Sequence, residues 1–129
     1  MKKIFLHGFV AGILAALASI IYYNLYQTTL VTHFEAIVNV GAIIGASMFG
    51  CMLIAGGYAL LLWQKKPNLT IWLNILVSVL SFASIISPIS MSLPLDIATP
   101  ELFPGLVVPM HFFPALAFFT LSPLFREAA

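Results

Sequence analysis

Four long apolar runs constrain this chain more than any other feature. They cover about residues 4–23, 37–63, 69–86 and 106–124, and a helix needs roughly 20 mostly apolar residues to cross a bilayer. The runs are continuous, without the alternation of apolar and polar residues that a membrane β-barrel requires. The sequence therefore predicts an all-α integral membrane protein, in which residues 1–129 form one domain folded as a four-helix bundle.

Charged residues make up 7% of the chain and hydrophobic residues 62%. A soluble domain carries about a quarter charged residues, so this chain lacks the polar groups needed to cover a surface in water. The net charge of +1 also leaves no basic surface for a nucleic acid. These values exclude a soluble enzyme, a disordered tail and a nucleic-acid-binding protein.

The first apolar run has an alternative interpretation as a signal peptide. Lys2 and Lys3 precede it, and residues 16–18 fit an A-x-A cleavage pattern. The apolar stretch continues past that point through residues 19–21. This continuation favours an uncleaved first helix.

The basic residues indicate an orientation. With four spans, all five fall on one side of the membrane: Lys2, Lys3, Lys65, Lys66 and Arg126. Because cytoplasmic loops are enriched in Lys and Arg, we expect both termini in the cytoplasm of a bacterial cell, in a multi-pass protein of its cytoplasmic (inner) membrane. Three of the four acidic residues fall on the opposite, outer side: Glu35, Asp96 and Glu101.

The two shorter connections carry helix signals. Residues 64–68 form a tight turn in which Asn68 is a candidate N-cap for the third helix. Residues 24–32 form a polar outer loop, and Thr32 with Glu35 fits a capping box. The second helix would then begin near His33.

The connection of residues 87–105 is the longest and carries four prolines among Leu, Met and Phe side chains. This composition favours a loop that lies on the bundle or in the membrane interface. Thr99, Pro100 and Glu101 fit a short helical turn, with Thr99 as its cap.

Small residues mark the faces on which membrane helices pack, because apolar side chains gain little by leaving lipid. Two GxxxG pairs and one further face stand out: Gly8 with Gly12, Gly41 with Gly45, and Gly50 with Gly57. The second span has such residues on two sides, which makes it the candidate for the centre of the bundle. One of these faces could instead be a dimer seam, since the motif alone does not distinguish the two.

The third span places Asn74, Ser78 and Ser81 on one narrow face. Two interpretations remain open: hydrogen bonds between helices, or a polar lining for a small ligand.

The fourth span contains helix-breaking residues. Pro109 is expected in its first turn, and the internal Pro114 is expected to kink the helix. His111 lies beside this kink. We expect its ring to make a structural hydrogen bond to a backbone carbonyl.

Signals for chemistry are sparse. No ionisable side chain lies at the middle of a span, and no GxSxG, HExxH, P-loop or paired-carboxylate motif occurs. The single cysteine, Cys51, excludes an intrachain disulfide and a thiolate cluster. We therefore expect no catalytic residue, no metal and no cofactor. A weaker alternative is a membrane enzyme with a metal held by outer side chains: His33, Glu35, Asp96, Glu101 and His111.

The length, the four spans, the Ser87-Pro88 pair that closes the third span and the Met110-His111 pair that opens the fourth resemble a family of small bacterial four-helix integral membrane proteins of unknown function. The resemblance covers roughly residues 35–125. It implies the fold and no activity. In such relatives the Met-His pair is associated with the fourth helix, which draws attention to His111.

The sequence favours a non-enzymatic accessory or structural subunit that packs against a larger membrane complex or against a second copy. The support is the lack of catalytic motifs together with the three small-residue faces. The alternative is a binding protein or carrier for a small apolar ligand. Its site would lie beneath residues 87–105 and use His111, Asn74 and Ser78. The expected partners are the lipid bilayer and another membrane protein, with no nucleic acid.

Overall fold

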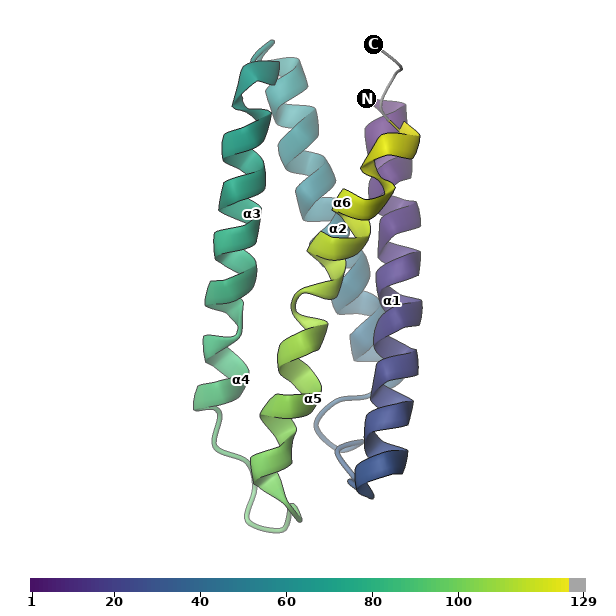
Figure 1. Cartoon of the computed structure of the whole chain (residues 1–129), viewed down its shortest axis with the longest axis vertical. Helices are drawn as coiled ribbons and strands as arrows, with labels where there is room; N and C mark the ends of the chain where they lie inside the picture. Colours follow the sequence, from purple (N-terminus) through teal and green to yellow (C-terminus); the bar gives the residue numbers. More distant parts are fainter. Residues whose placement is uncertain (126–129) are drawn as a thin grey trace.

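The protein is all-α in a computed structural model that describes residues 1–125 (Figure 1). No strand occurs among these residues. The helical elements, in chain order, are α1 (Lys2–Leu30), α2 (Val40–Trp63), η1 (Pro67–Leu69), α3 (Thr70–Ser84), α4 (Ile86–Ser90), η2 (Pro100–Leu102), α5 (Phe103–Met110) and α6 (Phe113–Phe125).

Four helical stretches are long and apolar enough to cross a membrane: Lys2–Leu30, Val40–Trp63, Pro67–Ser90 and Pro100–Phe125. They run alternately up and down (Figure 1). The N-terminus and the turn of residues 64–66 lie at one end, which we call the turn end. The connections of residues 31–39 and 91–99 lie at the other, the loop end. The four predicted runs are therefore helical, with ends that differ from those predicted.

The first helix is longer than expected, because residues 24–30, predicted as a loop, continue α1 to Leu30. Tyrosines on this extra length bind the fourth span. The Tyr22 hydroxyl donates to the Gly105 carbonyl at 2.6 Å, and the Tyr26 hydroxyl donates to the Leu102 carbonyl at 2.6 Å. Helix α1 is thus bonded to the fourth span at the loop end. Local sequence signals do not predict this contact, because its partners lie far apart along the chain.

The predicted capping box is wrong. Helix α2 begins at Val40, and its cap is Asn39, whose Oδ1 accepts from the Ala42 N–H at 2.8 Å. The Thr32 hydroxyl is buried and has no hydrogen-bond partner among the described residues. Glu35 turns toward α1 instead, where its Oε1 accepts from Gln27 at 3.5 Å.

The ends of the third span also differ from expectation. Asn68 lies inside η1, and α3 has no side-chain cap. Pro88 does not close the span, since α4 runs through it to Ser90. A proline in the first turn of a helix costs no hydrogen bond, because the N–H groups there have no partner within the helix.

The fourth span breaks where Pro114 was expected to kink it. Pro114 has no N–H for the Met110 carbonyl, and α5 ends at Met110 while α6 begins at Phe113. Across the break, the N–H groups of His111 and Phe112 reach back three residues, to Val108 and Pro109. Pro109 lies inside α5, because the helix starts three residues earlier than predicted. The expected turn at Thr99 is present as η2, although the Thr99 hydroxyl bonds to Ala98 and caps nothing.

Helices α1 and α2 pack closely because small residues line their contact. A Cβ on Gly8 would lie 2.7 Å from the Cβ of Ala55, and one on Gly12 would lie 2.6 Å from the sulfur of Met48. Helix α6 packs against both helices and completes a core of mostly small side chains: Ala11, Ala15, Cys51, Ile54, Ala55, Ala115, Ala117 and Phe118.

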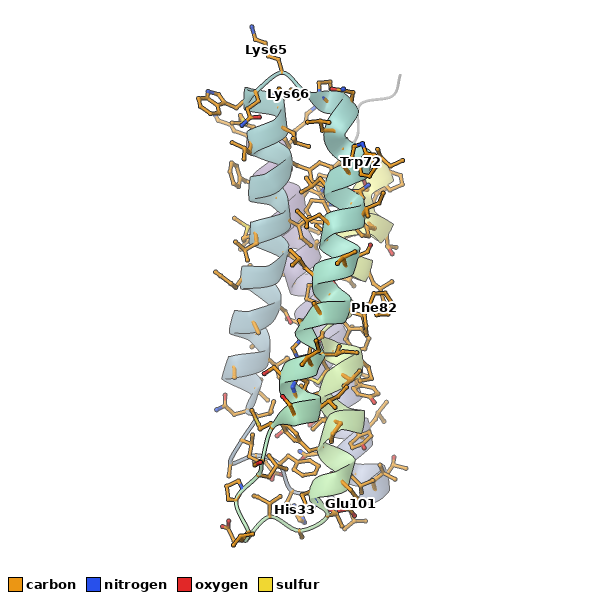
Figure 2. All side chains as sticks on the ribbon, turned by 90° about the vertical axis from the view of Figure 1, so that its left-hand side faces the viewer. His33, Lys65, Lys66, Trp72, Phe82 and Glu101 are labelled. Carbon is orange, nitrogen blue, oxygen red and sulfur yellow. The ribbon has the colours of Figure 1, made fainter. Side chains whose placement is uncertain are left out.

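Helix α3 stands at the edge of this arrangement and buries no residue. Trp72 projects outward from it, and the largely exposed Phe82 packs against the ring of Phe112 (Figure 2). It contacts α2 and α6 but not α1, so the bundle is close-packed on one side and loose on the other.

Charged residues separate between the two ends. Lys65 and Lys66 lie at the turn end, where the chain also begins, while Glu101 lies at the loop end (Figure 2). Arg126, the fifth basic residue, and Glu127 lie outside the described residues.

Candidate functional site

A cavity of about 770 Å³ lies on the loose side of the bundle. Side chains of α2, α3 and the α5–α6 segment form its walls, and Ser19 of α1 contributes from behind. Small-molecule sites in proteins have volumes of roughly 300–1,000 Å³. The cavity is therefore large enough for a ligand.

The cavity opens sideways between α2 and α3. Its lining includes Phe49 and Leu53 of α2 and Leu76 and Leu80 of α3, and each of these side chains is more than half exposed. In a membrane this opening would face lipid, because residues in the middle of α2 and α3 form it.

Two hydrogen bonds join α3 to the other helices that form the cavity walls. Toward the turn end, the Tyr58 hydroxyl of α2 donates to Oδ1 of Asn74. Toward the loop end, His111 Nδ1 and the Ser84 hydroxyl are 2.9 Å apart. Helix α3 is thus joined to α2 near one end and to the break in the fourth span near the other.

The break in the fourth span forms part of the cavity wall. Met110, His111 and Pro114 all line it. Gly50 of α2 lies opposite, where an added Cβ would be 3.2 Å from the Cβ of Pro114. The same proline that interrupts the helix thus shapes the wall and brings His111 to it.

The polar part of the lining is small and contains no Lys, Arg, Asp or Glu among residues 1–125. It consists of Ser19, Ser47, Ser81, Ser84 and His111, and the other lining residues in this range are apolar or Gly. Ligand sites commonly combine apolar walls with a few polar groups that orient the ligand.

His111 belongs to a chain of hydrogen bonds. The Ser84 hydroxyl donates to the Ser81 carbonyl at 2.7 Å, so its single proton is used there. His111 Nδ1 must then carry the proton that it shares with Ser84, and Nε2 of the neutral ring is an acceptor. We expected His111 to bond to a backbone carbonyl. Its partner is instead the Ser84 hydroxyl, which itself donates to the Ser81 carbonyl.

Ser19 is the one lining side chain that is both fully buried and unpaired. It is 1% exposed, and its hydroxyl has no hydrogen-bond partner among the described residues. A buried hydroxyl without a partner costs roughly 1–3 kcal/mol. Its oxygen has almost no accessible surface, so it lies behind the cavity wall rather than at the open face of the cavity.

Of the three residues predicted to bind a ligand, His111 lines this cavity, whereas Asn74 and Ser78 do not. Asn74 is bonded to Tyr58, and the Ser78 hydroxyl donates to the Asn74 carbonyl within α3. Ser78 lines a separate, smaller cavity of about 290 Å³. No residue of the loop 87–105 lines the main cavity, so the site lies beside the bundle rather than beneath that loop.

The serines of α3 mostly bond within their own helix. The hydroxyls of Ser78, Ser81 and Ser84 donate to carbonyls three or four residues earlier. Such bonds bend helices slightly and leave the oxygen able to accept. Of the predicted polar face, Asn74 alone takes part in a side-chain hydrogen bond between helices among the described residues, and Ser84, which lies outside that face, makes another.

The predicted packing glycines have different surroundings. Gly8 and Gly12 lie against α2, Gly50 lies against Pro114, and Gly57 lies against Leu73 of α3. Gly41 and Gly45 do not contact another helix, since an added Cβ would meet only Asn39 at Gly41 and nothing within 4 Å at Gly45.

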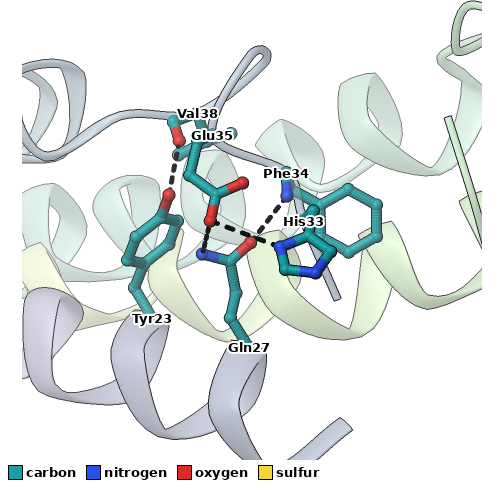
Figure 3. A network of polar contacts seen from close by, with 6 residues as sticks. All are labelled: Tyr23, Gln27, His33, Phe34, Glu35 and Val38. Atoms are coloured by element: carbon teal, nitrogen blue, oxygen red, sulfur yellow. Dashed lines mark hydrogen bonds and ion pairs between the residues drawn. The ribbon is translucent and has the colours of Figure 1, made fainter. Parts of the chain in front are cut away.

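The outer polar residues come together only in part. His33 Nδ1 and Glu35 Oε1 are 3.8 Å apart, on exposed side chains beside Gln27 (Figure 3). Gln27 Oε1 also accepts the Phe34 N–H at 2.6 Å, which holds this loop on α1. Among the described residues, no group of three His, Cys, Asp or Glu side chains could hold a metal ion.

Sequence reasoning did not single out Ser19 or Ser47 as cavity residues. Each hydroxyl lies within an apolar run at a position also suited to helix packing, so composition gives no signal for either. His7 was also passed over: it is buried, its Nε2 is 2.8 Å from the Phe118 carbonyl, and its ring stacks on Phe118.

Comparison with protein-family models, curated proteins and solved structures finds no match for this chain.

Proposed function

We propose that this chain is a membrane protein that binds a small, mostly apolar molecule in the lateral cavity and performs no catalysis on it. The observation that carries the proposal is a cavity of about 770 Å³ with apolar walls, open at the level where α2 and α3 would face lipid. An apolar molecule dissolved in the bilayer could enter there without crossing water.

Binding is favoured over catalysis by the groups that line the cavity. His111 is the one titratable side chain among the described lining residues. General acid–base or nucleophilic catalysis needs a second positioned group, such as a carboxylate, a thiol or an activated hydroxyl. Ser84 donates its proton to a carbonyl and is not poised as a nucleophile.

We further propose that the protein lies in a bacterial cytoplasmic membrane as a bundle of four spans, with both termini in the cytoplasm. The support is the positive-inside rule, applied to lysines that gather at the turn end. The lateral opening would then lie within the bilayer, and the loop end would face outward.

Two matched substitutions on α2 test the binding proposal. Ala46 lines the cavity and Ala42, one turn away, is exposed and does not. The full chain, in detergent micelles, is incubated with a hexadecane analogue that carries a photoreactive diazirine, illuminated and digested. Mass spectrometry then locates the labelled peptides.

We expect the label on cavity residues of α2 and α3 in the wild type and in Ala42→Phe, and weaker labelling of these residues in Ala46→Phe, because the phenyl ring occupies part of the cavity. Equal labelling of both variants, or labelling spread evenly over all exposed helix faces, would contradict the proposal. Circular dichroism of both variants controls for folding.

A second candidate function is that of an accessory subunit, which one observation favours. Gly45 and Gly56 have open space where a Cβ would stand, so this face of α2 is unused within the fold. Exposed small residues allow the backbone of another helix to approach closely. Gly45→Leu should abolish chemical crosslinking to a partner in native membranes, whereas Ala83→Leu, at an exposed position on α3, should preserve it. Unchanged crosslinking in Gly45→Leu removes this candidate.

A further inference from the structure

The cavity has a defined length along the bundle. Its lining runs from Ile43 to Ile54 on α2 and from Leu73 to Ser84 on α3. With a rise of about 1.5 Å per residue, each stretch measures roughly 16 Å. The hydrocarbon core of a bilayer is about 30 Å thick. The cavity is therefore about as long as the hydrocarbon of one leaflet is deep.

Packed side chains close the cavity at both ends. At the loop end, Ile43 belongs to a buried cluster that includes Phe34 and Phe103. At the other end, α2 and α3 meet where a Cβ on Gly57 would be 3.0 Å from the side chain of Leu73. A ligand therefore reaches the cavity sideways, between α2 and α3, rather than through an end of the bundle.

The lining favours hydrocarbon over a polar head group. Among residues 1–125 it contains no Lys, Arg, Asp or Glu. The hydroxyls of Ser81 and Ser84 donate to carbonyls of α3, so their protons are not available to a ligand. A phosphate placed inside would lose its hydration without gaining a counter-charge. A lipid head group must therefore remain outside the opening, while a hydrocarbon chain can enter.

The cavity lies toward the loop end of the bundle. On α2, Ile43 is in the first turn, whereas Ile54 is more than two turns before the last residue, Trp63. On the fourth span, Val107 and Ala115 bound the lining, and Val107 is the nearer of the two to its own end of the span. On α3 the lining is centred in its span. Hydrocarbon from the leaflet at the loop end is therefore the nearer source of an occupant.

From these observations we propose that the lateral cavity takes acyl-chain hydrocarbon of a phospholipid from the leaflet at the loop end, with the head group outside the opening. Because exposed side chains of α2 and α3 border the opening along its length, a chain can enter while its head group stays at the membrane surface. This inference rests on the proposed binding function and specifies its ligand class.

Photolabelling from a lipid tests the inference. The full chain is reconstituted in phosphatidylcholine vesicles with a trace of phosphatidylcholine that carries a diazirine at the middle of one acyl chain. Illumination labels every side chain that faces bulk lipid, so the informative residues are buried ones. Ile54 and Ala115 line the cavity although each is 8% exposed, whereas Ala16 is 6% exposed and does not line it. We expect label on Ile54 and Ala115 and none on Ala16.

Two further lipid probes test the direction of the chain. One carries the diazirine near the carboxyl end of the acyl chain and the other near its methyl end. Ser84 and Leu73 lie at the loop side and the turn side of the lining on α3. With the head group at the loop end, the first probe should favour Ser84 and the second Leu73. The reverse preference would overturn the assignment to this leaflet.

The matched pair of variants on α2 serves here as well. Ala46→Phe should weaken the label from the mid-chain probe on Ile54 and Ala115, because the ring occupies part of the cavity. Ala42→Phe should leave this label unchanged, and circular dichroism checks the fold of both. If Ala46→Phe does not fold, the comparison with Ala16 in the wild type still decides.

The hexadecane analogue, used as an alkane probe in the same vesicles, separates this inference from the proposed function. Label from the alkane probe on Ile54 and Ala115, with none from the lipid probes, would overturn the phospholipid assignment and leave binding of a free apolar molecule standing. Equal lipid labelling of Ala16 also overturns the assignment, because entry into the cavity would then not explain the label. No label from any probe on Ile54 and Ala115 removes both proposals.

Discussion

At the scale of single residues, glycines that look alike in the sequence have opposite surroundings. Gly8 and Gly45 each belong to a GxxxG pair. A Cβ at Gly8 would overlap Ala55 at 2.7 Å, whereas a Cβ at Gly45 meets nothing within 4 Å. The motif predicts close helix packing at both glycines, but only Gly8 lies against a neighbouring helix.

This difference predicts opposite effects of one substitution. Gly8→Ala should lower the free energy of unfolding by about 1–3 kcal/mol, because the α1–α2 contact must open. Gly45→Ala should raise it by roughly 0.5–1 kcal/mol through helix propensity. Denaturation in mixed detergent micelles measures both. A Gly8→Ala variant with the same free energy of unfolding as the wild type would contradict the close contact of α1 with α2 at this position.

A second residue-scale effect concerns Tyr22. Pro109 lacks the N–H that would bond to the Gly105 carbonyl four residues earlier, and the Tyr22 hydroxyl supplies the missing donor. The carbonyl that Tyr26 contacts, at Leu102, has an ordinary N–H four residues on, at Leu106.

Tyr22→Phe should therefore destabilise the protein by about 1 kcal/mol more than Tyr26→Phe, since it leaves an acceptor unsatisfied. Adding Pro109→Ala to Tyr22→Phe should recover most of that loss, as residue 109 regains its N–H. The same micelle denaturation assay applies. Equal losses in the two single variants, or no recovery in the double variant, would argue against this pairing.

At the scale of elements, the sequence predicts what depends on local chemistry. Hydropathy locates four helices, and Pro114 locates the break in the fourth, because a missing N–H acts on its own helix. The start of α2 was wrongly predicted at Thr32 and Glu35. Gln27 of α1 accepts the Phe34 N–H and donates to Glu35, and α2 begins only after Asn39, which caps it. The start of α2 therefore depends on these hydrogen bonds with α1, which local sequence signals do not predict.

The break itself gives the third prediction. Pro114→Ala restores an N–H opposite the Met110 carbonyl, so α5 and α6 should join into one helix. Amide hydrogen exchange at residues 111–113, which have an N–H in both proteins, should slow markedly in the variant. Since His111 and Pro114 line the cavity, labelling by the alkane probe should decrease as well. Unchanged exchange would mean that packing, rather than the proline, holds the break open.

At the scale of the whole molecule, the candidate site shows the limit of sequence reasoning. His111 could be singled out because it is a lone titratable residue beside a helix break. Ser19 could not, because its significance comes from a cavity formed by four spans and from a missing partner. Asn74 and Ser78 looked like lining residues, but their groups bond to Tyr58 and to the backbone of α3.

The orientation proposed for the molecule yields a fourth prediction. Lys65, at the turn end, and His33, at the loop end, are both exposed. In a Cys51→Ala background, a membrane-impermeant maleimide applied to intact spheroplasts should label His33→Cys. It should label Lys65→Cys only after the membrane is permeabilised. The reverse pattern would invert the topology.

The lateral cavity is proposed to hold a small molecule. The most direct test is native mass spectrometry of the full chain, extracted from its membrane in mild detergent, for the wild type, Ala46→Phe and Ala42→Phe. We predict a bound small-molecule mass on the wild type and on Ala42→Phe, and a smaller bound fraction of Ala46→Phe. An equal bound fraction of all three proteins, or no bound mass on the wild type, would contradict this proposal.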